Sequence, residues 1–99
     1  MYLVFEVRDK SGRKIHLSKE RWKHIIHEHP DVANKLYEIE EVIKNPLKIR
    51  ESKYDANVRF YYKYYKDSKQ KSKYILVAVK YLNGEGYIIT SFYVTKIRK

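Results

Sequence analysis

The chain has 99 residues, which is enough for one domain with a single core and excludes a separate cofactor domain. It has no cysteine, which excludes disulfides, thiolate nucleophiles and cysteine-based metal sites, and no apolar run near the roughly 20 residues of a membrane span, so we expect a soluble, cytoplasmic protein. The 22 Lys and Arg residues outnumber the 12 Asp and Glu residues and give a net charge of +10, which favours a polyanionic partner.

The N-terminal residues predict a hairpin. Residues 1–7 alternate as a strand does, residues 9–12 have turn chemistry, and residues 13–17 form a short second strand.

Two helices follow. Ser18 is a predicted N-cap, and Trp22, Ile25, Ile26 and His29 then recur on one helix face until Pro30, so this helix ends near Glu28. Asp31 is predicted to cap a second helix, which Asn45-Pro46 stops. The apolar stripe of this second helix is Val32, Leu36, Ile39, Val42 and Ile43.

The rest of the chain predicts strands. They cover residues 47–51, 58–66, 74–81 and 87–95, with turns at 67–72 and 83–86 and a basic tail at 96–99. The order is therefore ββααββββ. We expect one α+β domain over residues 1–99, in which an N-terminal hairpin precedes two helices packed on a four-stranded antiparallel sheet.

Charge and aromatic residues concentrate in the second half. Up to Pro46 the chain has nine basic and eight acidic residues, and after it thirteen basic and four acidic residues with nine of the eleven tyrosines. This combination is typical of a nucleic-acid surface, because lysine and arginine neutralise phosphates and rings stack on bases. The alternative is an ordinary solvated sheet, and richness in Lys, Glu, Ile and Tyr is also typical of a thermophile.

The strand over residues 58–66 has two distinct faces. One carries Arg59, Tyr61, Lys63 and Tyr65, a basic and aromatic ladder suited to single-stranded RNA, and the other carries Val58, Phe60, Tyr62 and Tyr64. The alternative is a solvated face with cross-strand tyrosine pairs.

The four histidines lie between residues 16 and 29, and three interpretations compete. A metal site at His24 and His27 is disfavoured, because their spacing is not His-Glu-x-x-His and the sequence offers no evident third ligand. A structural role suits His29 near the core and His27 on the polar face. Acid–base catalysis is the third: RNA cleavage without metal needs a base, an acid and a cation, and His24 and His29 could supply the first two. Their rings converge only if the helix ends before His29.

The cation could come from Arg59, or from Arg21 and Arg50, and Thr90 and Ser91 could donate hydrogen bonds to phosphate.

Several segments together carry a family resemblance. They are Leu17–Ile25, His29-Pro30, Ile43–Pro46, Arg59–Lys63, Tyr74–Val79 and Tyr87–Phe92. The chain resembles the phage-associated nucleases of the barnase, EndoU, colicin and RelE-like superfamily from about residue 13 to residue 93. The resemblance implies a metal-independent RNase fold, often with a toxin-like role. It matches His24 and His29 with the helix histidines of the family and Arg59 with its strand cation. It matches Thr90, together with Ser91, with the hydroxyl of the family's last strand.

We therefore expect an endoribonuclease without cofactor or metal ion that forms a 2′,3′-cyclic phosphate. Its predicted catalytic residues are His24, His29, Arg59, Thr90 and Ser91. Residues predicted to bind RNA are Arg21, Arg50, Tyr61, Lys63, Lys66 and Lys80. An acidic inhibitor protein is the expected partner if the protein is a toxin. The alternatives are a non-catalytic RNA-binding module that uses the tyrosine-rich strand, and a protein-interaction domain.

Overall fold

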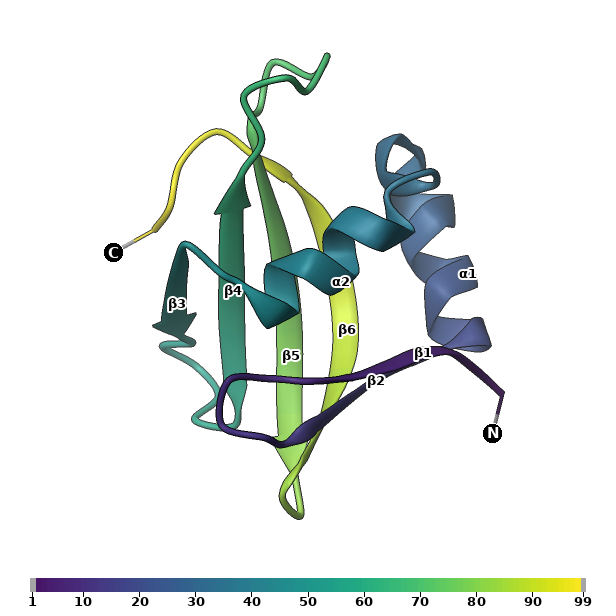
Figure 1. The fold of residues 1–99 in the computed structure, drawn as a ribbon, viewed down its shortest axis with the longest axis vertical. Helices are drawn as coiled ribbons and strands as arrows, with labels where there is room; N and C mark the ends of the chain where they lie inside the picture. Colours follow the sequence, from purple (N-terminus) through teal and green to yellow (C-terminus); the bar gives the residue numbers. More distant parts are fainter. Residues whose placement is uncertain (1, 99) are drawn as a thin grey trace.

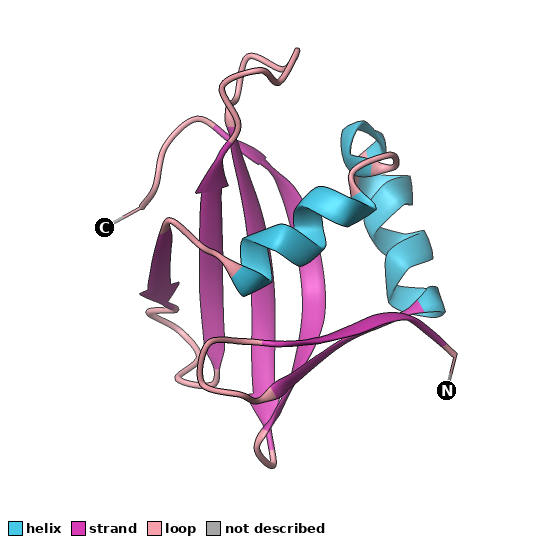
Figure 2. Ribbon diagram, in the orientation of Figure 1, coloured by secondary structure: helices cyan, strands magenta, loops and turns pink. Residues whose placement is uncertain are grey.

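The structure, a computed structural model, describes residues 2–98, so Met1 of the predicted first strand and Lys99 of the predicted tail lie outside the described residues. The α+β class and the ββααββββ order are confirmed (Figures 1 and 2). No helix within residues 2–98 is long and apolar enough to cross a membrane. The elements are β1 (Leu3–Arg8), β2 (Lys14–Ser18), α1 (Lys19–Glu28), the 3₁₀ turn η1 (Pro30–Val32), α2 (Leu36–Lys44), β3 (Lys48–Glu51), β4 (Val58–Tyr64), β5 (Tyr74–Leu82) and β6 (Glu85–Val94).

The strands form a single six-stranded mixed sheet in the order β1-β2-β6-β5-β4-β3. The prediction of a four-stranded antiparallel sheet was therefore wrong in detail: β3 to β6 are antiparallel neighbours as expected, but the N-terminal hairpin extends the same sheet. The added contact is parallel and short, and it pairs Ile15 with Gly86 and His16 with Tyr87. This pairing joins segments about 70 residues apart, which local sequence patterns do not report.

Gly86 explains why β2 can approach β6 at this point. A Cβ built on Gly86 would lie 2.5 Å from Cδ1 of Ile15 and 2.8 Å from Cγ1 of Val79. Both neighbours are fully buried, so neither has room to move. The absence of a side chain at residue 86 therefore permits the close contact between hairpin and sheet.

We expect Gly86→Ala to lower the free energy of unfolding by about 1–3 kcal/mol, because it overpacks this contact. Chemical denaturation measures the loss. The matched control is the double variant with Ile15→Val, which removes the nearest methyl group and should cost less than the sum of the two single changes. Strict additivity would show that the contact with Ile15 is not the cause.

The two faces of the sheet differ in what covers them. The front face, defined by Ile75, Val77 and Val79 of β5, packs against both helices (Figure 2). α2 crosses in front of β5, and α1 lies beside β6 (Figure 1). The back face is defined by Leu76 and Ala78 and carries a second apolar cluster. Because β5 is buried on both faces, its nearly continuous apolar sequence is that of a central strand.

Local signals set the helix ends. The Ser18 hydroxyl accepts a hydrogen bond from the Arg21 N–H at 3.1 Å, so the predicted N-cap is confirmed. α1 ends at Glu28, as the following Pro30 predicted. The predicted Asp31 cap was wrong: Pro30 begins a 3₁₀ turn, and α2 begins only at Leu36 without a side-chain cap. The chain makes i to i+3 bonds here, such as Ala33 N–H to Pro30 O at 3.1 Å, before it turns into α2.

A buried hydrogen-bond network connects the β1–β2 turn to the front face of the sheet. One carboxylate oxygen of Asp9 accepts from the backbone N–H groups of Ser11 and Arg13 at 2.9 and 3.0 Å, and the other accepts from the Tyr81 hydroxyl at 2.9 Å. The hydroxyls of Tyr61 and Tyr81 are also hydrogen-bonded to each other. Burial raises the pKa of both phenols, so both act here as neutral groups.

Candidate functional site

The four histidines lie on β2, on α1 and directly after α1, in the region where α1 packs against β2 and β6. His29 is the α1 C-cap, with φ −133° and ψ 72°, so the helix does end before it. Its N–H donates to Ile25 O at 2.7 Å, and its ring stacks on Phe92 of β6 with centroids 4.8 Å apart. Because Phe92 pairs with Leu76, the half-buried His29 ring reaches the back-face side of β6.

His24 lies one turn after Arg21 on an exposed flank of α1. Arg21 in turn contributes to a hollow between α1 and β6, so this flank borders the edge of the sheet. His27 is exposed, as predicted. Within residues 2–98 no hydrogen bond joins the His24 and His29 rings, so a substrate atom would have to lie between them for both to act on it.

The hollow has a volume of about 180 Å³ and includes a histidine to which the sequence analysis gave no role. The His16 ring stacks on Tyr87 with centroids 5.3 Å apart. Its Nδ1 lies 3.2 Å from Glu6 and its Nε2 lies 2.6 Å from Glu85. The lining residues are His16, Ser18, Arg21, Tyr87, Ile88 and Ile89.

The two carboxylates lie at different nitrogens of the His16 ring. In the part of the chain that the structure describes, no group of three His, Asp or Glu side chains is placed to hold a metal ion. The sequence did contain a signal for His16, because the predicted hairpin places it opposite Glu6 on the face away from Ile15 and Leu17. The contribution of β6 depends on the parallel pairing and had no such signal.

A β-bulge decides which last-strand hydroxyl is accessible. Thr90 pairs with Ala78 whereas Ile88 pairs with Val79, which leaves Ile89 as the extra residue. Thr90 therefore lies half-buried on the back face, two residues before Phe92. Ser91 points the other way, is fully buried and donates to Leu76 O at 2.8 Å.

The prediction that Ser91 contacts substrate is corrected by this burial, since its hydroxyl is already used inside the core. Thr90 remains the accessible hydroxyl of this pair.

The structure separates Arg59 from His29 and Thr90. Arg59 pairs with Val79, so it lies on the front face, where its guanidinium is 5.4 Å from the centre of the Tyr81 ring. Thr90 lies on the opposite face. Arg50 does share the face of Thr90, because register places them in one row across β3 to β6, through Phe60 and Ala78. The Arg50 Nε donates to Arg98 O at 3.2 Å.

The face of β4 that carries the expected RNA-binding ladder is turned toward the helices, so Tyr61 is not accessible to RNA. Tyr61 is only 2 % exposed, and Tyr65 donates to the Glu41 carboxylate at 2.8 Å. Burial, and then the nearby Glu41, raise the pKa of Tyr65. Lys63 donates to Asn45 O at 2.9 Å on the same side. Alternation identified two faces of β4 correctly, but both are largely covered, so composition did not show which one meets solvent.

The two remaining lysines have different positions. Lys80 of β5 pairs with Tyr87, so it lies on the back face beside the hollow, and its Nζ is 3.1 Å from Asp55. Lys66 is exposed just after β4.

A larger hollow, of about 340 Å³, lies between α2 and the β4–β5 connection. It contains no histidine, and its charged residues are of both signs: Lys35 and Lys66 beside Glu38 and Asp67. Volume alone does not identify a catalytic site, so we place the candidate site beside the histidines of β2 and α1.

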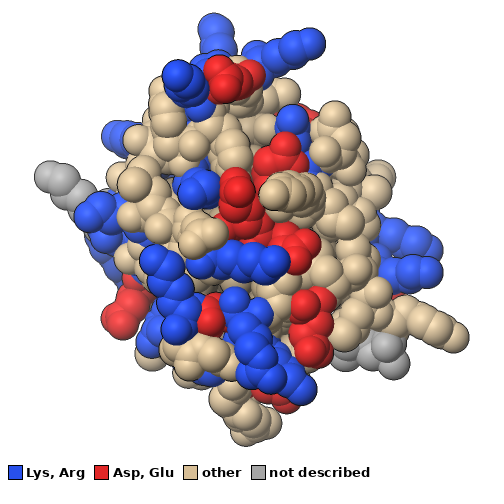
Figure 3. Space-filling view, viewed as in Figure 1, with Lys and Arg blue, Asp and Glu red and all other residues tan. Residues whose placement is uncertain are grey.

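The charge at the centre of the front face disfavours this place for a polyanionic ligand. Figure 3 shows acidic side chains gathered over α2 at the centre of the front face, with lysines and arginines beside and below them and at the rim. The acidic residues of α2 are Glu38, Glu40 and Glu41. A polyanion would be repelled at this centre.

We define the histidine edge as Arg21, His24, His29, Thr90 and the His16 hollow. Arg21 and His16 line one hollow, and His29 stacks on Phe92, two residues after Thr90 on β6. These residues carry complementary chemical groups. Imidazoles exchange protons near neutral pH, a threonine hydroxyl donates hydrogen bonds, and a guanidinium binds phosphate oxygens. Such a set can act on a phosphodiester.

Comparison with known proteins agrees with this chemistry. The profile of a family described as phage-Barnase-EndoU-ColicinE5/D-RelE like nuclease 2 matches residues 5–99. Neither the curated proteins nor the solved structures include a significant match. The match spans almost the entire chain, so the protein belongs to the phage Barnase-EndoU-ColicinE5/D-RelE like nuclease 2 family.

Proposed function

We propose that the protein is a metal-independent endoribonuclease that cleaves RNA by attack of the 2′-hydroxyl, leaving a 2′,3′-cyclic phosphate. Membership of a nuclease family supports the reaction class. The observation that carries the proposal is the stacking of His29 on Phe92, which brings a histidine to the sheet face that holds Thr90.

His24 and His29 share the proton transfers in this proposal. One accepts the proton of the 2′-hydroxyl, and the other donates a proton to the departing 5′-oxygen. Thr90 donates a hydrogen bond to the phosphate. Arg21 meets the developing charge in place of Arg59, since Arg59 faces the other side of the sheet. Arg50 shares the face of Thr90 but lies three strands away, so it contacts phosphates farther along the RNA.

The direct test is incubation of the purified protein with single-stranded RNA in EDTA, beside the His24→Ala/His29→Ala double variant. We expect cleavage by the wild type alone, with cyclic-phosphate ends. Equal cleavage by both proteins would refute the mechanism. Salt-sensitive binding without cleavage would instead identify a non-catalytic RNA-binding module.

Thr90 and Ser91 allow a second comparison. We expect Thr90→Val to lower kcat about tenfold with little change in stability, because it removes one hydrogen bond to the substrate. Ser91→Ala should do the reverse: it leaves kcat unchanged and lowers the free energy of unfolding by about 1 kcal/mol, because its hydroxyl bonds only within the core. Cleavage assays and denaturation curves on both variants measure the two effects, and a loss of kcat in Ser91→Ala alone would reverse the assignment.

The toxin-like role and an acidic inhibitor are part of the same proposal, supported by the family and by the net charge of +10. Induced expression should arrest the growth of a bacterial host, and the double variant should not. Growth arrest by both proteins would separate toxicity from RNA cleavage.

A further inference from the structure

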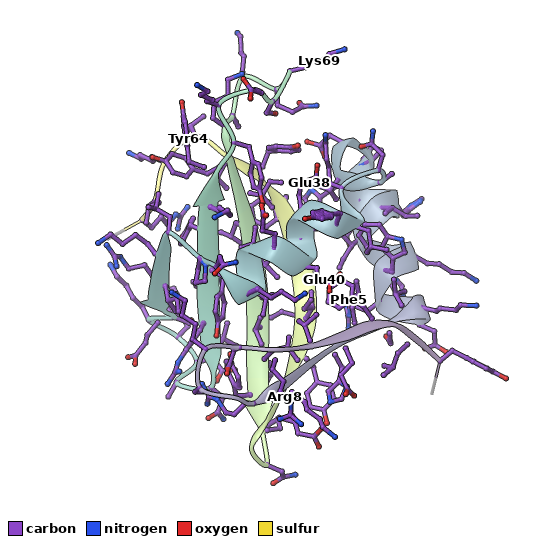
Figure 4. All side chains as sticks on the ribbon, viewed as in Figure 1. Phe5, Arg8, Glu38, Glu40, Tyr64 and Lys69 are labelled. Carbon is purple, nitrogen blue, oxygen red and sulfur yellow. The ribbon has the colours of Figure 1, made fainter. Side chains whose placement is uncertain are left out.

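The connection between β4 and β5 is the most lysine-rich part of the molecule. It projects beyond the end of the sheet, with Lys69 near its tip (Figures 1 and 4). Residues 66–73 include four lysines and one acidic residue, Asp67. In the described part of the chain, the ion pairs do not include Lys66, Lys69 or Lys71. These three charges are therefore available to a ligand.

Two tyrosines flank this loop at its base. Tyr64 ends β4, Tyr74 begins β5, and the two residues are direct cross-strand partners. Their ring centroids are 5.1 Å apart with an angle of 64° between the planes, so the edge of one ring meets the face of the other. Tyr64 is 48 % exposed. An edge-to-face pair leaves ring surface free on which a nucleobase can stack.

The tyrosine pair shares a sheet face with the candidate catalytic site. Tyr64 is two residues after Tyr62 on β4, and Tyr74 is two residues before Leu76 on β5, so all four side chains are on the back face. Ala78, the partner of Thr90, is four residues from Tyr74 along β5, which corresponds to about 13 Å. A single strand with its scissile phosphate at Thr90 reaches this pair within a few nucleotides.

Two cations flank the back face on β3, to one side of the direct route between the two places. Lys48 and Arg50 of β3 lie on the back face, beside Tyr62 and Phe60. The centre of that face is apolar and partly covered by Ile97. An extended strand would thus pass beside the positive charge of β3 and meet that of the lysine loop.

We propose that Tyr64, Tyr74 and the lysines at residues 66, 69 and 71 form a second RNA-binding site, which holds single-stranded RNA at a distance from the scissile bond. The inference rests on the proposed function, because its ligand is the substrate of that site. Stacking on Tyr64 tolerates any base, and the lysines contact phosphates, so the site adds affinity and a minimum substrate length without sequence preference.

Binding is measured by fluorescence anisotropy with 2′-O-methyl RNA, which lacks the attacking hydroxyl, in lengths of about 4 and about 12 nucleotides. The variants are Tyr64→Leu and the triple change Lys66→Gln/Lys69→Gln/Lys71→Gln. The matched control removes the same charge elsewhere, with Lys10→Gln/Lys44→Gln/Lys53→Gln, whose lysines are exposed on the hairpin turn, at the end of α2 and between β3 and β4. Thermal melting verifies that each variant is folded.

We expect each loop-site variant to weaken binding of the longer RNA about tenfold, while the control changes it much less. The triple variant should also reduce the slope of log K against log salt by about 2. With cleavable RNA, KM for the longer substrate should rise at unchanged kcat, and the shorter substrate should be unaffected.

The outcomes separate the two proposals. If the wild type cleaves RNA but the loop triple behaves like the control triple, the second site is refuted and the nuclease stands. If the wild type binds RNA through the loop but never cleaves it, the proposed reaction fails and the second site stands. If the wild type neither binds nor cleaves RNA, both proposals are refuted.

Discussion

Replacing His24 or His29 singly with alanine is expected to lower kcat for RNA cleavage by about 10²–10⁴, the usual contribution of a general acid or base. Each histidine serves one of the two proton transfers, so neither compensates for the other. Single-turnover cleavage at saturating protein measures the effect on the chemical step alone. Because both residues act on one reaction, the double variant should be little slower than the worse single variant.

His27→Ala is the matched control, since this third histidine is exposed on the same helix and has no place in the proposed reaction. Its kcat should equal that of the wild type. His29 also packs on Phe92, so His29→Ala requires a melting curve beside the assay, and His29→Phe retains an aromatic ring for the stack without a titratable nitrogen. A fully active His29→Phe variant would remove His29 from the chemistry.

Local sequence signals predicted the elements well because their causes are local. Ser18 predicted the start of α1, and Pro30 predicted its end and the release of His29 from helical geometry. Asp31 failed as a cap because the chain first closes a 3₁₀ turn at Pro30. The strands and their antiparallel order from β3 to β6 followed from alternation and turn residues alone.

What the sequence did not determine was which side of the sheet each residue faces and which distant segments pair. Arg59 and Arg50 both alternate on strands, and only the register shows that Arg50 shares the back face with Thr90. The bulge at Ile89 determines that Thr90 is accessible and Ser91 is buried, and no local sequence pattern predicted a bulge there. The hollow around His16 depends on a parallel pairing between residues 15–16 and 86–87. The sequence therefore identified the histidines of the candidate site. It did not identify which charged and polar side chains lie on the same side of the sheet.

The second large effect is expected in stability and centres on Asp9. Asp9→Asn should lower the free energy of unfolding near neutral pH by about 2–3 kcal/mol, because the charged acceptor of a buried hydrogen-bond network is replaced by a neutral amide. The loss affects the Tyr81 hydroxyl and the Arg13 guanidinium, whose Nε lies 3.3 Å from the carboxylate. Asp31→Asn is the matched control, since Asp31 is exposed and caps no helix by its side chain. Urea denaturation of the three proteins compares them.

The pH dependence tests the same assignment through its sign. Burial alone would raise the pKa of Asp9, but hydrogen bonds from Ser11, Tyr81 and the Arg13 backbone, with the Arg13 charge, outweigh it and hold the pKa below its ordinary value of 3.8. A carboxyl with a lowered pKa stabilises the fold fully above its unfolded pKa, and this stabilisation disappears as pH falls through the folded pKa. Wild-type stability should therefore fall on acidification from about pH 5 to about pH 2 more steeply than that of Asp9→Asn. Parallel curves for the two proteins would show that the Asp9 carboxylate does not supply this stabilisation.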